Sequence, residues 1–144
     1  MTMTYDLNRF VTAQSHIYDR VILELTEGRK TKHWIWYIFP QIKGLGGSRL
    51  SVKYGLRSKQ EVAAYLAHPL LYPRLKECTA LVLEHSGKPL EDILPSPSNL
   101  KFISCMTCFM LEKPDEPIFL EALDAFNDGK MFAKTARFYI DDGY

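Results

Sequence analysis

The sequence lacks an excess of charge of either sign, and it lacks long hydrophobic runs. Its 18 basic and 17 acidic side chains leave a formal net charge of +1. Because dedicated nucleic-acid-binding domains are usually strongly basic, this balance argues against that class. The longest apolar stretch, residues 34–39, is far shorter than the roughly 20 residues that a membrane-spanning helix needs. We therefore expect no nucleic-acid partner and no membrane partner.

Cysteine is scarce, and no export signal is visible. Residues 1–8 do not combine a basic start with the apolar stretch of a secretory signal. The 3 cysteines, Cys78, Cys105 and Cys108, are an odd number, which favours reduced thiols over a disulfide framework. Together these features predict a cytoplasmic protein.

The motifs of common hydrolases and metal sites are also missing, including the G-x-S-x-G, H-E-x-x-H and EF-hand patterns. Cys105 and Cys108 have the spacing of half a zinc or redox site, but a second pair of ligands is lacking. Residues three apart share a helix face, so the two thiols are expected to pack inwards as small apolar groups. The sequence predicts no metal and no cofactor.

What is present is the composition of one folded domain. The 144 residues are 47% hydrophobic and 24% charged, as in ordinary globular proteins. Apolar residues recur at helical spacing, which predicts an all-α, compact single domain over residues 1–144 with about six or seven short helices. The expected helices cover residues 7–26, 31–39, 59–68, 70–85, 100–111, 116–128 and 130–140, with at most one short turn between 89 and 97.

Several helix starts carry residues that can cap exposed N–H groups. The expected caps are Thr31, Ser58 with Glu61, Ser98 or Asn99, and Asp115. Residues 34–39 are all apolar and should be buried, and their pattern alone fits a short helix or a strand. The surrounding helices favour a helix that ends before Pro40.

A glycine-rich loop follows at residues 43–49. Its backbone N–H groups, flanked by Lys43 and Arg49, have the character of an anion-binding turn. The loop lacks the lysine–serine ending of a P-loop, so a plain flexible connection is the favoured interpretation.

Two other groups of residues combine rings, cations and hydroxyls. Trp34 and Trp36 lie close to Lys32, His33 and Gln41, a set that suits a pocket for a planar ligand as well as it suits core packing.

The second group lies on the helix expected over residues 100–111. Lys101, Ser104 and Thr107 share one side of it and suit a phosphate or a sugar edge. The favoured interpretation of this helix taken alone is a lysine that extends towards solvent and hydroxyls that bond back to the backbone. Among the carboxylates, Glu24 should adjoin the aromatic segment.

The motifs resemble one family along nearly the whole chain. The matching segments are F-V-T-A-Q (10–14), G-R-K (28–30), H-W-I-W-Y-I-F-P-Q (33–41), G-L-G-G-S (44–48), Y-L-A-H-P (65–69) and K-F-I-S-C-M-T-C-F (101–109). They are similar to domain-of-unknown-function family 1810, whose members are sometimes labelled calpastatin. The resemblance implies a compact helical fold and supplies no catalytic residues. Calpastatin itself is a disordered inhibitor, whereas this composition is that of a folded domain.

The chain departs from the family pattern in two places. The pattern has a glycine and an acidic residue where this chain has Pro95 and Ser98-Asn99, and an aspartate where Phe132 stands. If those acids serve a shared chemistry, this chain has lost or altered it. A weaker similarity connects the sequence with YbiA-like N-glycosidase proteins, but it is an analogy of fold, which does not establish function.

The resulting hypothesis is a small-ligand site for a nucleotide-like or phosphorylated-sugar molecule, with the reaction left open. His33 is the candidate catalytic residue, because an imidazole exchanges protons near neutral pH. The candidate ligand-binding residues are Lys32, Trp34, Trp36, Gln41, Ser48, Tyr54, Lys101, Ser104 and Thr107. The alternative is a non-catalytic protein–protein interaction module.

The two hypotheses predict different surfaces. A cavity bordered by Lys101 and at least one of His33, Gln41 and Ser48 favours the ligand site. A flat apolar patch at the same place favours the interaction module. The sequence does not indicate an oligomeric state.

Overall fold

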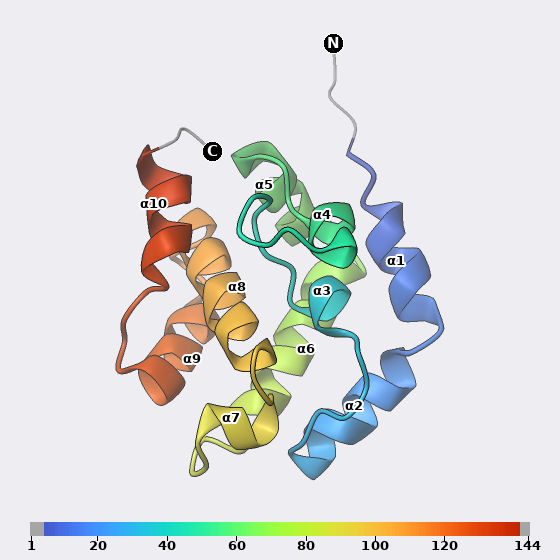
Figure 1. Ribbon diagram of the computed structural model, residues 1–144, viewed down its shortest axis with the longest axis vertical. Coiled ribbons are helices and arrows are strands. Elements are labelled where there is room, and N and C mark those ends of the chain that lie inside the picture. Colours follow the sequence, from blue (N-terminus) through green and yellow to red (C-terminus); the bar gives the residue numbers. More distant parts are fainter. Residues whose placement is uncertain (1–4, 142–144) are drawn as a thin grey trace.

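The computed structural model describes residues 5–141, and these form ten helices (Figure 1). The helices are α1 (Asn8–Ser15), α2 (Tyr18–Glu27), α3 (Ile35–Ile38), α4 (Arg49–Tyr54), α5 (Lys59–Ala67), α6 (Leu71–Leu83), α7 (Leu90–Ile93), α8 (Ser98–Glu112), α9 (Pro117–Asn127) and α10 (Ala133–Asp141). The predicted helical character is confirmed, but the predicted number is too low. Three of the ten, α3, α4 and α7, have only four to six residues.

The helix predicted over residues 7–26 is two helices, α1 and α2, which change direction at His16 and Ile17. Next to the break, the hydroxyl of Ser15 donates to the carbonyl of Thr12 at 2.7 Å. The break lets α1 pack against α3 while α2 packs against α6. Both halves keep an inward apolar face, so the spacing of apolar residues continues across the turn and hides it.

The apolar segment 34–39 forms α3, a single turn that ends before Pro40 as predicted. Thr31 does not cap it, because the residue before α3 is Trp34 and no side-chain cap is present there. The backbone N–H of Thr31 donates to the Glu24 carboxylate at 2.7 Å. The glycine loop that follows leads into α4, a helix that the pattern did not predict. Ser48 is its N-cap, with the hydroxyl accepting from the N–H of Ser51 at 3.1 Å.

The other predicted caps have mixed outcomes. The Ser58 hydroxyl accepts from the N–H of Glu61 at 3.1 Å, as a capping box requires, but the Glu61 carboxylate reaches back to the N–H of Arg57. Neither Ser98 nor Asn99 caps α8, which begins at Ser98 itself. The residue before α9 is Glu116, so the predicted cap at Asp115 is also wrong.

Helix α8 is the centre of the molecule and contacts α3, α5, α7, α9 and α10 (Figure 1). Its inward side chains include Phe102 and Phe109, which are fully buried. The Phe102 ring meets the Phe39 ring edge to face, with centroids 4.8 Å apart. Aromatic pairs of this geometry are favourable beyond the area that they bury. The aromatic segment is therefore held directly against the start of α8.

Cys78 on α6 and Cys105 and Cys108 on α8 are buried free thiols. Burial raises the pKa of the Cys78 thiol to about 12 and raises the pKa of the other two as well. Within residues 5–141, no cluster of His, Cys, Asp and Glu has the arrangement of a metal site. Over the same residues, no helix combines the length and the apolar character that crossing a membrane requires.

Candidate functional site

The segment between α2 and α3 is organised by one buried carboxylate, that of Glu24. One of its oxygens accepts from the backbone N–H groups of Thr31 and Lys32, at 2.7 and 3.1 Å. The same oxygen accepts from the indole N–H of Trp34 at 3.0 Å. The other oxygen pairs with the guanidinium of Arg20 at 2.8 Å. Glu24 therefore fixes the path of the backbone that carries His33 and Trp36.

The surroundings of Glu24 keep it ionised. Burial by itself raises the pKa of the carboxyl, but the bonds from Thr31, Arg20, Lys32 and Trp34 outweigh burial and lower it to about 2. Glu24 is 1% exposed, and both oxygens of its carboxylate already accept hydrogen bonds from the protein. Its role is to hold the 29–34 segment in place.

A hollow of about 490 Å³ opens where this segment faces the start of α8. One wall consists of Arg29, Lys30, Thr31, His33, Ile35 and Trp36, and the other of Pro95, Ser96, Pro97, Ser98 and Lys101. Its volume falls in the range of small-molecule sites. We call it the first hollow.

The charge of the first hollow is of one sign. Its ionisable side chains are Arg29, Lys30, His33 and Lys101, and all are basic. Lys101 is half-buried, yet in the part of the chain that the structure describes no ion pair or side-chain hydrogen bond engages its ammonium group. This ammonium group is therefore available to bond to an anion.

Among Arg29, Lys30 and Lys101, the side chain of Lys30 is the most constrained. Its ammonium lies 5.3 Å from the centre of the Trp34 ring. Burial lowers its pKa, while the charge of Glu24 acts in the opposite direction. Lys30 and Arg29 follow the left-handed Gly28 that ends α2, where an added Cβ would come within 2.9 Å of the side chains of His85 and Lys88.

A second hollow, of about 240 Å³, lies on the other side of Lys101. It is lined by Gln41, Leu45, Pro97, Leu100, Lys101, Phe132 and Lys134. It shares Pro97 and Lys101 with the first hollow. Its lining is more apolar, and its two ionisable side chains, Lys101 and Lys134, are again basic.

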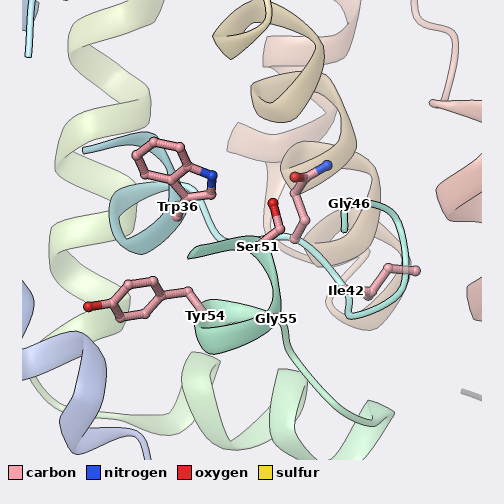
Figure 2. A pocket seen from close by; sticks show the side chains of 7 residues that line it. Trp36, Ile42, Gly46, Ser51, Tyr54 and Gly55 are labelled. Atoms are coloured by element: carbon pink, nitrogen blue, oxygen red, sulfur yellow. The ribbon is translucent and has the colours of Figure 1, made fainter. Parts of the chain in front are cut away.

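The glycine loop borders a third and much smaller space. Figure 2 shows Trp36 and Tyr54 on one side of it and the loop at Gly46 on the other. Its volume of about 10 Å³ accommodates a water molecule at most. A Cβ at Gly46 would approach the Ser51 hydroxyl to 2.7 Å, so close packing against α4 explains a glycine here.

The structure brings together some of the residues predicted to form the site. His33, Trp36 and Lys101 line the first hollow, and Gln41 and Lys101 line the second. The expected cavity shared by Lys101 and His33 or Gln41 is therefore confirmed as geometry. The ligand-binding and catalytic roles of these residues stay predictions.

Other predicted site residues lie elsewhere. Trp34 is fully buried and offers no face to a ligand. Ser104 is buried with its hydroxyl 2.6 Å from that of Thr135, and the buried Thr107 hydroxyl donates to the carbonyl of Ile103 at 2.9 Å. These two hydroxyls are structural, as the simpler interpretation of that helix suggested.

The remaining predicted residues lie at the surface or beside the small space. Lys32 is exposed and lines neither hollow. Ser48 is also outside both hollows, because its hydroxyl caps α4. Tyr54 is buried beside the small space next to the glycine loop.

The sequence did not predict part of the first hollow, namely Arg29, Lys30, Thr31, Ile35 and residues 95–98. Two signals were present in the sequence. A pair of basic residues directly follows the helix-ending Gly28, and the alternating Pro-Ser-Pro-Ser run directly precedes the helix that carries Lys101. Neither signal states that the two segments face each other, because that depends on the path of the intervening chain.

The comparisons with known proteins agree with this fold. Residues 4–139 match the family described as "Protein of unknown function (DUF1810)". The crystal structure of the conserved hypothetical protein Rv1873 from Mycobacterium tuberculosis is 43% identical, with a TM-score of 0.92, over 94% of this chain and 96% of that chain. Among curated proteins, none matches. The weaker YbiA-like similarity stays a prediction. The chain belongs to the DUF1810 family, a family of unknown function.

Proposed function

We propose that this domain binds a small phosphate-bearing ligand, nucleotide-like or a phosphorylated sugar, in the first hollow. The observation that carries the proposal is that the ionisable side chains of its lining are all basic. Arg29, Lys30 and Lys101 surround a space of about 490 Å³ in which every ionisable side chain is basic. Such a lining attracts anions and raises their local concentration.

The uncharged groups of the lining suit the same ligand class. Thr31, Ser96 and Ser98 supply hydroxyls that can bond to phosphate or sugar oxygens. The half-buried ring of Trp36 supplies a stacking surface for a base. The hollow also borders the first turn of the 15-residue α8, where a helix favours negative charge.

His33 is the lining residue suited to proton transfer, and it stays our predicted catalytic residue. The reaction is left open. The three buried free thiols support a reducing compartment such as the cytoplasm as the place of action.

Thermal unfolding in the presence of AMP, ADP, ribose 5-phosphate and glucose 6-phosphate tests the proposal. A ligand present at about a hundred times its dissociation constant stabilises by roughly 2.7 kcal/mol, which raises the melting temperature by roughly 8 °C for a domain of this size. We expect at least one of these compounds to produce a concentration-dependent shift, and adenosine, which lacks phosphate, to produce none.

The Lys101→Met variant locates the ligand. Losing a charge-assisted hydrogen bond should weaken binding by roughly tenfold or more. Lys130→Met is the matched control, because it removes one positive charge from an exposed side chain outside both hollows. The absence of a shift with all four phosphate compounds, or equal loss of binding in both variants, would contradict the proposal. Either result would favour the alternative, a non-catalytic protein–protein interaction module.

A further inference from the structure

The first and second hollows meet at one residue. Lys101 lines both of them, and so does Pro97, which directly precedes α8. The two spaces, of about 490 and 240 Å³, therefore lie on either side of a single half-buried ammonium group. A ligand whose phosphate is held by Lys101 has room to extend in both directions.

The positive charge is arranged around this junction. Arg29 and Lys30 lie on the far side of the first hollow, and Lys134, from the start of α10, lies on the second. Lys101 is therefore the cation that both spaces share, and each space has further cations of its own. That arrangement fits a molecule whose anionic group lies at Lys101 and whose two halves extend into spaces that are also positively charged.

Each hollow also has its own aromatic ring. Trp36 borders the first, and the half-buried Phe132 borders the second together with Leu45 and Leu100. Phe132 is held in place because its backbone N–H donates to the buried hydroxyl of Thr107 at 2.9 Å. The Thr107 hydroxyl itself donates to Ile103 within α8, so the backbone that carries the second ring is bonded to the same helix as Lys101.

We propose that the two hollows are one bipartite site for a ligand in which a diphosphate joins two ring-bearing halves, as in a dinucleotide. Lys101 contacts the diphosphate, Trp36 stacks on one half and Phe132 contacts the other. This inference rests on the proposed function and goes beyond it, since a mononucleotide or a sugar phosphate fills the first hollow alone.

Calorimetric titration with diadenosine diphosphate, ADP and AMP tests the bipartite site. A second stacked base strengthens binding, so diadenosine diphosphate should bind roughly tenfold or more tightly than ADP. The Leu100→Trp variant fills the second hollow from a side chain that is 52% exposed, so it should leave the fold intact. It should reduce the affinity for diadenosine diphosphate to that for ADP and leave the affinity for ADP unchanged.

Two further variants complete the test. Leu120→Trp, at an exposed position on α9 outside both hollows, is the matched control and should change neither affinity. Phe132→Ala should act as Leu100→Trp does, provided that its thermal unfolding stays cooperative. Equal affinities of the native chain for diadenosine diphosphate and ADP would overturn the bipartite site and leave the proposed function standing. No binding of any of the three compounds would overturn the bipartite site, and the absence of a thermal shift with the two sugar phosphates as well would overturn the proposed function.

Discussion

The carboxylate of Glu24 accepts four hydrogen bonds, and three of their donors belong to Thr31, Lys32 and Trp34. The segment that supplies those donors also forms one wall of the first hollow. A single buried acceptor thus connects α2 with the candidate site. Replacing it removes the charge around which the segment is folded.

We expect Glu24→Gln to destabilise the domain by roughly 2 kcal/mol, because an amide replaces a charged acceptor and turns its NH2 donor towards the guanidinium of Arg20, which lies on the second carboxylate oxygen. Urea unfolding measures the loss directly. Glu27→Gln is a suitable control, since Glu27 is an exposed carboxylate on the same helix. Equal stabilities of the two variants would show that the contacts of Glu24 contribute little.

The same carboxylate predicts a pH dependence. The pKa of Glu24 falls from its usual 4.5 to about 2 on folding, so the unfolded chain binds the proton more readily. The stability that Glu24 contributes is therefore complete above about pH 5 and is lost as the pH falls towards 2. The difference in unfolding free energy between the native chain and Glu24→Gln should shrink between about pH 6 and pH 3. A difference that stays constant over that range would exclude the mechanism.

At this scale the sequence predicted the smaller part of the site. His33, Trp36 and Lys101 were found because rings and cations at a helix start or in a dense apolar segment are unusual. Trp34 has the same character two residues away but is buried, because its indole N–H is drawn to Glu24. The spacing of apolar residues does not distinguish two tryptophans in one short turn. What distinguishes them is the Glu24 carboxylate, which accepts from the indole N–H of Trp34 alone.

Among the helices, α4 is the shortest whose start has a side-chain cap. Ser48 accepts from the N–H of Ser51 at 3.1 Å and lies outside both hollows. Because an N-cap hydroxyl stabilises a helix by about 1 kcal/mol, Ser48→Ala should lower the unfolding free energy by roughly that amount. It should leave the affinity for every phosphate compound unchanged.

Ser86→Ala is the control for this substitution, since Ser86 is exposed in the turn after α6. It should change neither stability nor binding. A clear loss of ligand affinity in Ser48→Ala alone would indicate that the glycine loop takes part in ligand binding, which would contradict the geometry described above.

Helix type was predictable where a long apolar stripe was present, as in α5, α6 and α8. The ends of the helices were less predictable than their type. The start of α8 lacks the predicted side-chain cap because Pro97 occupies the N-cap position, and the turn between α1 and α2 leaves the apolar spacing intact. Changes of direction depend on which partner each half packs against, and this is a property of the tertiary structure.

For the molecule as a whole, the three thiols report on global unfolding. Cys78, Cys105 and Cys108 are at most 1% exposed and belong to helices that share one core. A reagent such as dithionitrobenzoate needs the thiolate, which burial disfavours at all three positions. We expect negligible labelling of the folded chain and complete labelling in denaturant.

The midpoint of that labelling should coincide with the midpoint of helix loss measured by circular dichroism. Agreement would show that the core opens in one cooperative step, as small single domains usually do. Rapid labelling of one thiol under native conditions would instead reveal a local opening and would contradict a single shared core.

The central position of α8 has a consequence for how a ligand would be received. The helix that carries Lys101 also packs against α3, α5, α7, α9 and α10, so the backbone at Lys101 cannot shift without disturbing the core. One wall of each hollow is therefore set when the chain folds and not when a ligand arrives. The entropic cost of ordering that wall falls on folding and not on binding. A larger part of the free energy of each ligand contact therefore contributes to the affinity.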